Sequence, residues 1–436
     1  MSERVEALPE TLLTGSVSGP LGGNTEMPGD KSISHRALIL GGLARGRTRI
    51  SGLLESDDVL HTAKAVQAFG ATVERTGPGE WSVEGATWQS PEQPVDCGNS
   101  GTGARLMMGA AAGFPISATF SGDASLSSRP MERVLGPLRA MGARTEGSTL
   151  PVTIHGGNLK GLSFVNEKAS AQVKSAILFA GLMASGAVEV AEPAPSRDHS
   201  ENMLRAFGCE VASDDGVVRL GQRRELSGTE VRVPGDPSSA AFPLVAALIV
   251  PGSRITIRKV MVNPLRTGLI TTLLEMGAEL RLENERVEGG EKVADLNIAS
   301  SRLEGVEVAA QRAPSMIDEY PILSIAAAFA HGRTILHGLG ELRVKESNRL
   351  AAVVEGLVAC GVEAFEDGDS LVIEGAGRPP SGGARVRAYH DHRIAMSFLV
   401  MGLAAERPVT VDSVGMIATS FPSFVPLMRS LGADIR

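Results

Sequence analysis

The feature that most constrains this chain is a short pattern that recurs six times: an apolar run, a glycine, a small residue and an alternating segment. Its versions are AFGATV, AMGART, AFGCEV, EMGAEL, ACGVEA and SLGADI, with glycines 72, 66, 69, 84 and 71 residues apart. Self-similarity at a nearly fixed period indicates that one supersecondary unit is repeated. Six units of about 72 residues nearly account for the 436 residues of the chain.

Each unit is predicted to combine two helices with several strands. Apolar positions at helical spacing precede the glycines, as in DVLHTAKAVQA before Gly70, and a glycine just past a helix end is a typical cap. An earlier helix in each unit, such as SAQVKSAILFAGLMASG, is apolar around most of its circumference, which predicts burial on all sides. A short β-branched strand follows it, as in SATFSG. An ordinary α/β chain with recurrent helix caps is the alternative, but it does not explain why these parts recur together in order.

The two ends of the chain indicate how the units are grouped. Gly432 lies four residues from the C-terminus, so the sixth unit lacks the strand that follows the other glycines, and residues 1–23 could supply it. We therefore expect one domain over residues 24–234 with units one to three. The second domain is expected over residues 1–23 and 235–436 with units four to six. The first residues, MSERVEALPE, have no apolar core, so no secretory signal is expected there.

Composition excludes several classes of protein. Acidic residues outnumber basic ones by 50 to 42, and a chain with a net charge of −8 is a poor general binder of nucleic acid. The longest apolar stretches contain Pro and have about a dozen residues, whereas a membrane span needs about 20. The three cysteines form no C-x-x-C pair, which argues against a zinc site or disulfides and fits a reducing cytoplasm.

The predicted buried helices begin with polar and charged residues, in segments such as PGDKSISHR and GNSGTGAR. Capping explains Asp236 and Asp391, but cations are unfavourable at the positive end of a helix dipole. A bound phosphate or carboxylate would remove this conflict. If the helices run parallel, their starts converge on one face of each domain, and two such faces enclose an anion-binding cleft; scattered surface charge is the alternative. The cations at these starts are Lys31, Arg36, Arg105, Lys174 and Arg393.

Further cations occupy loops, as in GDASLSSRP, APSRDH and ELRVKESNR. In the last segment Lys345 and Arg349 are four residues apart, which predicts that they share one helical face; alternatively, KESNR is a solvated helix start in which Glu346 pairs with Arg349. A nucleotide ligand is not indicated, because GDKS lacks the glycine spacing of a Walker A motif and no Rossmann fingerprint is present. The sequence contains no H-E-x-x-H pattern, which would indicate a metal site.

Read together, these segments resemble the motifs of the 5-enolpyruvylshikimate-3-phosphate synthase family, in its bacterial class II branch. The matching strings run in order from about Gly15 to the C-terminus: PGDKSISHRALIL, GNSGTGAR, GDASLSSRPM, SAQVKSAILFAGL, SRDH, DEYPIL, RVKESNRL, DHRIAMS and TSFP. The resemblance implies a two-domain inside-out α/β barrel of six βαβαββ units, three per domain, with the active site in the interdomain cleft.

The resemblance also implies the reaction. The enolpyruvyl group of phosphoenolpyruvate passes to the 5-hydroxyl of shikimate 3-phosphate and phosphate leaves, in the pathway to aromatic amino acids. No metal or organic cofactor is implied. The expected partners are these two small molecules, with no nucleic acid and no membrane, and the expected protein is a cytoplasmic monomer.

Roles for particular residues follow from the matching motifs. Asp318 is expected to be the base toward the 5-hydroxyl, Glu346 the proton donor to the methylene carbon, and Lys31 a contact of both substrates that assists proton transfer. The residues expected to hold shikimate 3-phosphate are Lys31, Ser32, Arg36, Ser170, Gln172, Ser196, Arg197, Asp318 and Lys345. Those expected to hold phosphoenolpyruvate are Lys31, Asn99, Gly101, Thr102, Arg129, Gln172, Arg349 and Arg393, with Arg105 a weaker candidate.

The chain departs from the family pattern at two positions. Ala171 stands where many members carry a second Ser, so one hydrogen bond to phosphate is expected to be missing. Thr419 stands where many carry Lys, which puts a phosphoenolpyruvate contact of those relatives in question. Gly101 follows the family and lacks a side chain, so glyphosate, which competes for the phosphoenolpyruvate site in this family, is expected to fit.

Two rival functions predict different residues. The sister enzyme that transfers enolpyruvyl to UDP-N-acetylglucosamine commonly uses a Cys in a mobile loop of the second unit, and that loop here, GDASLSSRP, contains none. Cys97 is expected to be a packed thiol instead. A repeat scaffold for a protein partner would expose a recognition face, whereas the unusual charges here open helices that are predicted to be buried.

Overall fold

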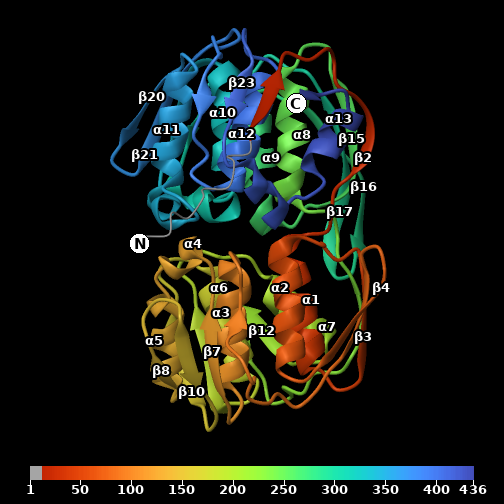
Figure 1. Cartoon of the computed structure of the whole chain (residues 1–436), viewed down its shortest axis with the longest axis vertical. Helices are drawn as coiled ribbons and strands as arrows, with labels where there is room; N and C mark the ends of the chain where they lie inside the picture. The colour runs from red at the N-terminus through yellow and green to blue at the C-terminus, as the bar shows by residue number, and fades with distance from the viewer. Residues whose placement is uncertain (1–11) are drawn as a thin grey trace, which may run out of the picture.

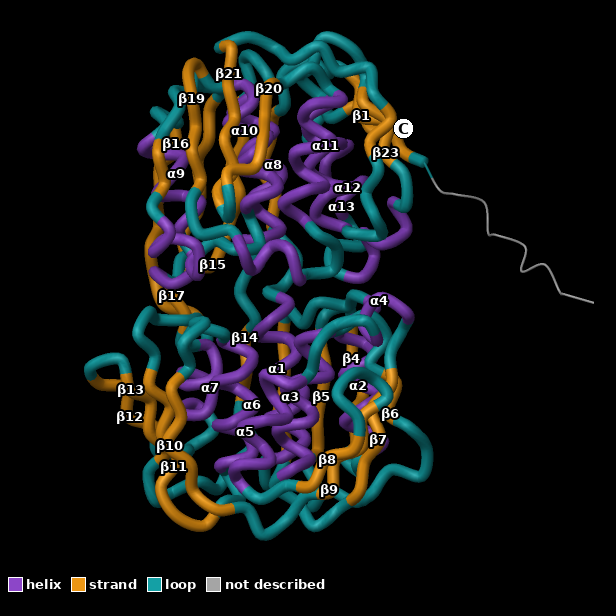
Figure 2. Tube along the Cα trace, turned by 90° about the vertical axis from the view of Figure 1, so that its left-hand side faces the viewer, coloured by secondary structure: helices purple, strands orange, loops and turns teal. Residues whose placement is uncertain are grey.

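The structure, a computed structural model, describes residues 12–436 and has two lobes stacked end to end (Figure 1). In each lobe the helices fill the interior and the strands lie toward the outside (Figure 2). Residues 1–11, which include the segment predicted to carry no secretory signal and part of the predicted second domain, lie outside the described residues. Within residues 12–436 no helix is long and apolar enough to cross a membrane.

The described strands form six four-stranded sheets with one common plan, which confirms the sixfold repeat. In each sheet a parallel pair of strands is followed by two further strands, each antiparallel to its neighbour. The lower lobe in Figure 1 holds three of these sheets. The first contains β14 (Glu230–Arg232), β3 (Arg47–Ser51), β5 (Glu80–Glu84) and β4 (Thr72–Gly77). The second contains β6 (Val95–Asp96), β7 (Ser117–Ser121), β9 (Val152–His155) and β8 (Arg144–Glu146). The third contains β10 (Lys160–Val165), β11 (Ser185–Ala191), β13 (Val217–Leu220) and β12 (Val211–Asp214).

The upper lobe holds the other three sheets. The fourth contains β2 (Gly22–Glu26), β15 (Arg254–Met261), β17 (Glu291–Ala299) and β16 (Glu279–Glu288). The fifth contains β18 (Glu307–Val308), β19 (His331–Leu336), β21 (Ser370–Ala376) and β20 (Glu363–Asp367). The sixth contains β22 (Arg385–Val386), β23 (Val409–Val411), β1 (Leu13–Ser16) and β24 (Asp434–Ile435). Because β1 pairs with both β23 and β24, the N-terminal segment supplies the strand that the sixth unit lacks, as predicted.

One inner helix per unit is buried, as its apolar circumference predicts. The inner helices are α1 (Lys31–Leu43), α3 (Gly101–Ala112), α6 (Ala171–Gly181), α8 (Pro237–Ile249), α10 (Tyr320–Phe329) and α12 (His392–Gly402). The outer helices are α2 (Asp57–Ala68), α5 (Glu132–Met141), α7 (His199–Ala206), α9 (Gly268–Glu275), α11 (Arg349–Ala359) and α13 (Phe424–Ser430). Shorter helical turns are α4 (Ala124–Ser127), η1 (Pro264–Arg266), η2 (Ala310–Ser315), η3 (Gly340–Val344) and η4 (Val414–Thr419).

The repeated glycines end the outer helices in the left-handed conformation that a glycine cap adopts. Their φ angles lie between +82° and +114°, which confirms the prediction of six equivalent helix ends. A side chain at these positions would strain the backbone. The six residues are Gly70, Gly142, Gly208, Gly277, Gly361 and Gly432.

The chain crosses between the lobes twice, and the two crossings are hydrogen-bonded to each other. Gly29 and Gly235 form an antiparallel bridge, flanked by hydrogen bonds from the Asp30 N–H to the Pro234 carbonyl (2.8 Å) and from the Asp236 N–H to the Pro28 carbonyl (2.9 Å). A Cβ on Gly29 would lie 1.9 Å from the Gly52 carbonyl oxygen, so only glycine fits this approach. Helices α1 and α8 both begin immediately after this bridge, which places their first turns at the junction of the lobes.

Candidate active site

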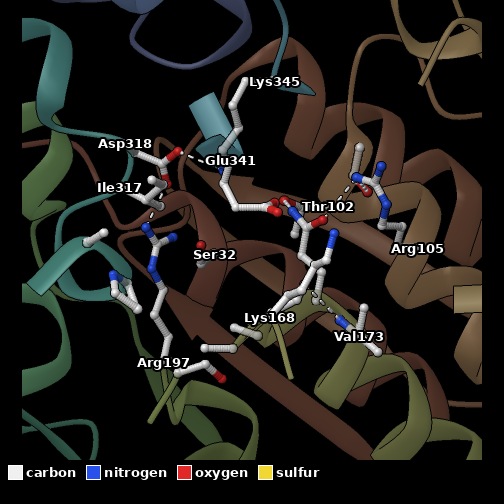
Figure 3. Close-up of a pocket in the computed structure, with 18 of the residues that line it drawn as sticks. Ser32, Thr102, Arg105, Lys168, Val173, Arg197, Ile317, Asp318, Glu341 and Lys345 are labelled. Atoms are coloured by element: carbon white, nitrogen blue, oxygen red, sulfur yellow. Dashed lines mark hydrogen bonds and ion pairs between the residues drawn. The ribbon is translucent and has the colours of Figure 1, made fainter. Parts of the chain in front are cut away.

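A cavity of about 420 Å³ lies between the lobes, lined by the starts of inner helices from both of them (Figure 3). This arrangement confirms that the helix starts converge. Ten Lys and Arg side chains and seven carboxylates line the cavity, so cations predominate. Sixteen residues were predicted for the site, and all of them except Asn99 and Arg349 are in the lining.

Asn99 and Arg349 lie behind the cavity wall, where each one holds a lining residue. The Asn99 side chain accepts a hydrogen bond from Arg129 Nη2 at 3.0 Å and donates one to Asp123 at 2.7 Å. Arg349 is 1% exposed and donates to Asp391 at 2.8 Å and to Asp318 at 3.2 Å. Both residues therefore position groups that face the cavity.

At the starts of α1 and α6, side-chain oxygens accept free backbone N–H groups, and a carboxylate pairs with the cation Lys31. The Asp30 carboxylate accepts the Ile33 N–H at 2.8 Å to cap α1, and Ser170 is the N-cap of α6. Lys31, the first residue of α1, forms an ion pair with Asp58. A neighbouring carboxylate thus offsets the unfavourable charge of Lys31 beside the helix dipole.

Asp318, which precedes α10, joins cations from both lobes. Its oxygens lie 2.6 Å from Arg197 Nη2 in the lower lobe, 3.4 Å from Lys345 Nζ and 3.2 Å from Arg349 Nη1. Burial by itself would raise the pKa of Asp318, but Lys345, Arg197, Arg393 and Arg349 outweigh it and hold that pKa well below its usual value. Asp318 is therefore an ionised carboxylate that can accept a proton.

Glu346 lies between two arginines. Its carboxylate is 2.5 Å from Arg349 Nη2 and 3.5 Å from Arg129 Nη1, which belongs to the other lobe. Burial favours the neutral acid, but Arg349 and Arg129 dominate and hold the pKa of Glu346 well below its usual range. Glu346 is consequently ionised.

The prediction that Lys345 and Arg349 share a helical face is wrong. Asn348 is the N-cap of α11 and Arg349 its first residue, so Lys345 lies before the helix in extended backbone. The two cations meet through Asp318 instead. The alternative is correct about the pairing of Glu346 with Arg349 but not about a solvated helix start, because Arg349 is buried.

Lys174 is buried beside the cavity and does not line it. Its Nζ lies 2.7 Å from carboxylate oxygens of both Glu192 and Glu201. Glu192 also accepts the Ser196 hydroxyl at 2.6 Å and the Ser196 N–H at 3.2 Å. The unusual cation at the start of α6 is thus explained by buried carboxylates that fix the Ser196 loop.

Arg266 is a lining residue that the sequence motifs did not reveal. It is 4% exposed, and its guanidinium lies 3.0 Å from Asp30 and 3.5 Å from Asp236, the N-caps of α1 and α8. Burial and the nearby Asp30 charge raise the pKa of Asp236 to about 7, whereas Asp30 keeps a low pKa, because Arg266 and His199 outweigh its burial. Arg266 lies in a short turn outside any recognisable motif, so only the fold shows that it joins both helix starts.

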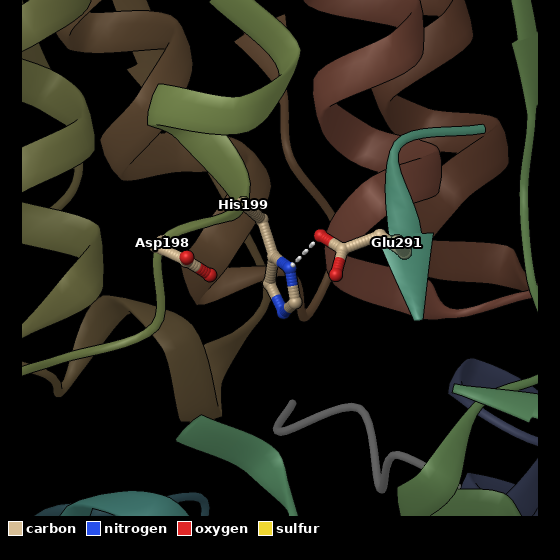
Figure 4. Close-up of side chains that lie close together, drawn as sticks. All are labelled: Asp198, His199 and Glu291. Carbon is tan, nitrogen blue, oxygen red and sulfur yellow. Dashed lines mark hydrogen bonds and ion pairs between the residues drawn. The ribbon is translucent and has the colours of Figure 1, made fainter. Parts of the chain in front are cut away.

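A second group near Arg266 consists of Asp198, His199 and Glu291 (Figure 4). Each residue offers one atom that could bind a metal ion, and these atoms lie within 4.8 Å of one another. Their hydrogen bonds favour a network between lobes over a metal site. His199 Nδ1 is 2.8 Å from Glu291, and the Asn263 amide donates to Asp198 at 2.7 Å and to Glu291 at 2.9 Å. The Arg266 guanidinium, 3.3 Å from His199 Nε2, already supplies a cation there.

Cys97 is a packed thiol, as predicted. It is 4% exposed, and burial raises its pKa to about 12, so it is not a thiolate nucleophile at neutral pH. Cys209 and Cys360 are also buried and free.

Several polar atoms of lining residues are buried without a hydrogen bond. Buried polar groups normally have partners, so a cluster of unpaired donors and acceptors around one cavity favours a polar ligand. Ala171 lines the cavity as well, whereas Thr419 does not and donates its hydroxyl to the Met416 carbonyl at 2.7 Å. The unpaired atoms are Asp58 Oδ1, Arg129 Nε, Arg266 Nε and His392 Nε2.

Known proteins resemble this chain along nearly its whole length. The family model for EPSP synthase (3-phosphoshikimate 1-carboxyvinyltransferase) matches residues 16–428. A 3-phosphoshikimate 1-carboxyvinyltransferase from Caulobacter vibrioides is 57% identical over 435 residues, covering 97% of this chain and 98% of its own. One from Parvibaculum lavamentivorans is 57% identical over 434 residues, covering 97% of this chain and 96% of its own.

Solved structures resemble it too. An EPSP synthase from Acinetobacter baumannii superposes with a TM-score of 0.87 at 42% identity, covering 98% of this chain and 99% of the other. The enolpyruvyl transferase NikO from Streptomyces tendae shares the fold at 20% identity, with a TM-score of 0.79 and 98% coverage of both chains.

Proposed function

Because the chain belongs to the EPSP synthase (3-phosphoshikimate 1-carboxyvinyltransferase) family, we propose that its interlobe cavity performs that family's reaction with the residues described above. The reaction moves the enolpyruvyl group of phosphoenolpyruvate to the 5-hydroxyl of shikimate 3-phosphate and releases phosphate, within the shikimate pathway. The observation that carries the proposal is the pairing of Asp318 from one lobe with Arg197 from the other inside a cation-rich cavity.

Shikimate 3-phosphate is assigned to the lower-lobe side of the cavity and Asp318. The starts of α1 and α6 present Ser32 and Ser170, whose hydroxyls lie near helix N–H groups, the usual setting for a phosphate. Cations surround these hydroxyls and offset the phosphate charge. The complete set is Lys31, Ser32, Arg36, Ser170, Gln172, Ser196, Arg197, Asp318 and Lys345.

Phosphoenolpyruvate is assigned to the space between the start of α3 and the segment that carries Glu346. Its phosphate and carboxylate would replace carboxylate partners of the arginines there. Gln172 lies between the two substrate regions, since it donates to Thr102 Oγ1 at 2.8 Å and accepts from Arg105 at 2.9 Å. The set is Lys31, Asn99, Gly101, Thr102, Arg129, Gln172, Arg349 and Arg393, with Arg105 beside it.

Proton transfer follows from the positions of the two carboxylates. Asp318 accepts the 5-hydroxyl proton as that oxygen bonds to C2 of phosphoenolpyruvate, and Glu346 donates a proton to the methylene carbon. The bond between C2 and the phosphate oxygen then breaks and phosphate leaves, while the methyl carbon returns a proton to the Glu346 carboxylate, which restores the double bond. Lys31, at the start of α1, assists these transfers.

Glu346 must gain a proton before it can donate one. Arg129 and Arg349 hold its pKa low in the empty cavity, but an anionic substrate that pairs with these arginines compensates their charge. The pKa of Glu346 then rises, because burial remains while the opposing attraction weakens. Binding of phosphoenolpyruvate thus prepares its own proton donor.

The two lobes are proposed to be the two domains, residues 24–234 and residues 1–23 with 235–436. The N-terminal crossing is placed a few residues after 24, since β2 pairs with β15 in the upper lobe. One chain lines both sides of the cavity, which supports a monomer, and three free buried cysteines support a cytoplasmic location.

Phosphate release from phosphoenolpyruvate tests the function. We expect release by the purified protein only when shikimate 3-phosphate is present, and none with UDP-N-acetylglucosamine. In the variant Asp318→Asn, the turnover number should fall by about 10²–10⁴-fold, because the base is lost while the shape is kept. Release that requires the UDP-sugar, or unaltered turnover in the variant, would contradict the proposal.

A further inference from the structure

Lys168 differs from the other cations around the cavity because it has no partner. It lies in the loop between β10 and α6, two residues before the N-cap Ser170, and it lines the cavity (Figure 3). The Lys168 side chain is exposed. Within residues 12–436 its ammonium makes no hydrogen bond and no ion pair. No predicted role was assigned to it, and it lies outside the SAQVKSAILFAGL string that carries the resemblance.

The loop around Lys168 is held in one shape. The Asn166 amide donates to the Ser170 carbonyl at 3.1 Å and to Glu192 Oε1 at 2.7 Å, and the Ala169 N–H donates to the Asn166 carbonyl at 3.1 Å. Ala169 has a φ of +47°, in the left-handed region that non-glycine residues seldom adopt. The backbone at Lys168 is therefore anchored to the buried Glu192, and the flexible part is the side chain alone.

Several donors on this side of the cavity are already engaged within the protein. Ala171, next to Ser170, offers no hydroxyl, and the Ser196 hydroxyl already donates to Glu192 at 2.6 Å. Arg197 and Lys345 both pair with Asp318. The ammonium of Lys168 has no partner and lies two residues before Ser170, so it is free to donate to a phosphate. A cation and a phosphate form a strong, charge-assisted hydrogen bond.

We propose that Lys168 binds the 3-phosphate of shikimate 3-phosphate, beside Ser170 at the start of α6. This inference rests on the proposed function, because it concerns the same substrate. Lys168 contributes to binding of the phosphate and not to the chemical step, which takes place at the 5-hydroxyl.

The test compares Lys168→Gln with the wild type and with the control Lys160→Gln. Lys160 is an exposed lysine on the same strand–loop segment but outside the cavity lining, so its loss changes the net charge equally. In Lys168→Gln we expect the KM for shikimate 3-phosphate to rise roughly tenfold, the size expected for a partly exposed charged hydrogen bond. The turnover number and the KM for phosphoenolpyruvate should stay within about twofold, and Lys168→Arg should recover most of the affinity.

Shikimate, which lacks the phosphate, provides the second comparison as a competitor of shikimate 3-phosphate. Its inhibition constant should be the same in the wild type and in Lys168→Gln. An unchanged KM for shikimate 3-phosphate, an equal loss with Lys160→Gln or with shikimate, or a rise confined to phosphoenolpyruvate would overturn the role of Lys168. A wild-type protein that does not use shikimate 3-phosphate at all would instead overturn the proposed function.

Discussion

At the scale of single residues, Gly101 shows how one missing side chain shapes the cavity. It is the first residue of α3, in helical backbone that alanine also adopts, so its role depends on space. A Cβ there would lie 2.8 Å from Arg105 Nη1 and 3.3 Å from Arg129 Nη1. Both guanidiniums would have to move, and Arg129 is assigned to phosphoenolpyruvate.

We therefore expect Gly101→Ala to weaken inhibition by glyphosate at least about tenfold, since crowding a packed site costs roughly 1–3 kcal/mol. The measurement is the inhibition constant against phosphoenolpyruvate. Gly136→Ala is the matched control, because a Cβ at Gly136 meets only Glu132 Oε1 at 3.7 Å and Gly136 does not line the cavity. The same inhibition constant in Gly101→Ala and in the wild type would contradict this assignment.

Sequence reasoning found residues whose chemistry is unusual for their position. Lys31 and Arg393 were recognisable because cations seldom open buried helices, and the motif resemblance added Asp318 and Glu346. Arg266 and Lys168 gave no such signal. Each occupies an ordinary loop or turn, and its place at the cavity results from contacts between segments that are distant in the sequence.

At the scale of elements, the repeat could be predicted almost completely, because helix caps and apolar periodicity are local properties of the chain. Gly70 and Gly432 end helices as expected. The prediction that Lys345 lies in the same helix as Arg349 is wrong, because α11 begins at Arg349. A spacing of four residues between two charges cannot distinguish a helix from the turn that precedes it. The side chain of Asn348 decides the boundary by accepting the Ala351 N–H.

The starts of α1 and α8 are joined by a single buried cation. Arg266 lies between the capping residues Asp30 and Asp236, directly beside the two chain crossings. The guanidinium favours the ionised form of both carboxylates, but burial and the charge of Asp30 oppose ionisation of Asp236, so the two groups differ in pKa. Asp236 is the one with the raised pKa, about 7 against 3.8, because of burial and then Asp30.

This arrangement predicts a pH-dependent stability. A carboxyl whose pKa is higher in the folded than in the unfolded state favours folding while it is protonated, and that contribution is lost as pH rises from about 4 to about 7. Asp236→Asn keeps an N-cap acceptor but cannot ionise. Relative to the wild type, its free energy of unfolding should therefore increase over this range, by up to about 4 kcal/mol.

Urea unfolding of both proteins between about pH 4 and 7.5 measures that difference. Asp30 does not interfere, because its lowered pKa affects stability only at more acidic pH, where protonation removes its attraction to Arg266. Parallel stability curves for the two proteins would show that Asp236 is ionised throughout.

At the scale of the whole molecule, ion pairs link the two lobes across the cavity. Arg129 pairs with Glu346 across the cavity, and Arg197 pairs with Asp318. These pairs join the lobes through groups that we propose to bind the substrates, so substrate binding is expected to change the contacts between the lobes. Arg133 and Glu341 form a third cross-lobe pair, at 2.7 Å, with about a third of each side chain exposed.

The Arg133–Glu341 pair offers a way to separate closure from direct attraction of the substrate. An exposed pair contributes less than about 1 kcal/mol, but reversing one charge replaces attraction by repulsion across the cavity. We expect both Arg133→Glu and Glu341→Arg to increase the radius of gyration in solution scattering without ligand, and to raise the KM for shikimate 3-phosphate severalfold. The double reversal, Arg133→Glu with Glu341→Arg, should restore both values because the charges are again opposite. If these side chains acted only by attracting the anionic substrate, Glu341→Arg would lower that KM while Arg133→Glu raised it, and the radius would not change. Opposite effects of the two single variants on the KM would therefore reject a closing role for this pair. Equal increases in the KM and in the radius, both reversed in the double variant, would establish that role.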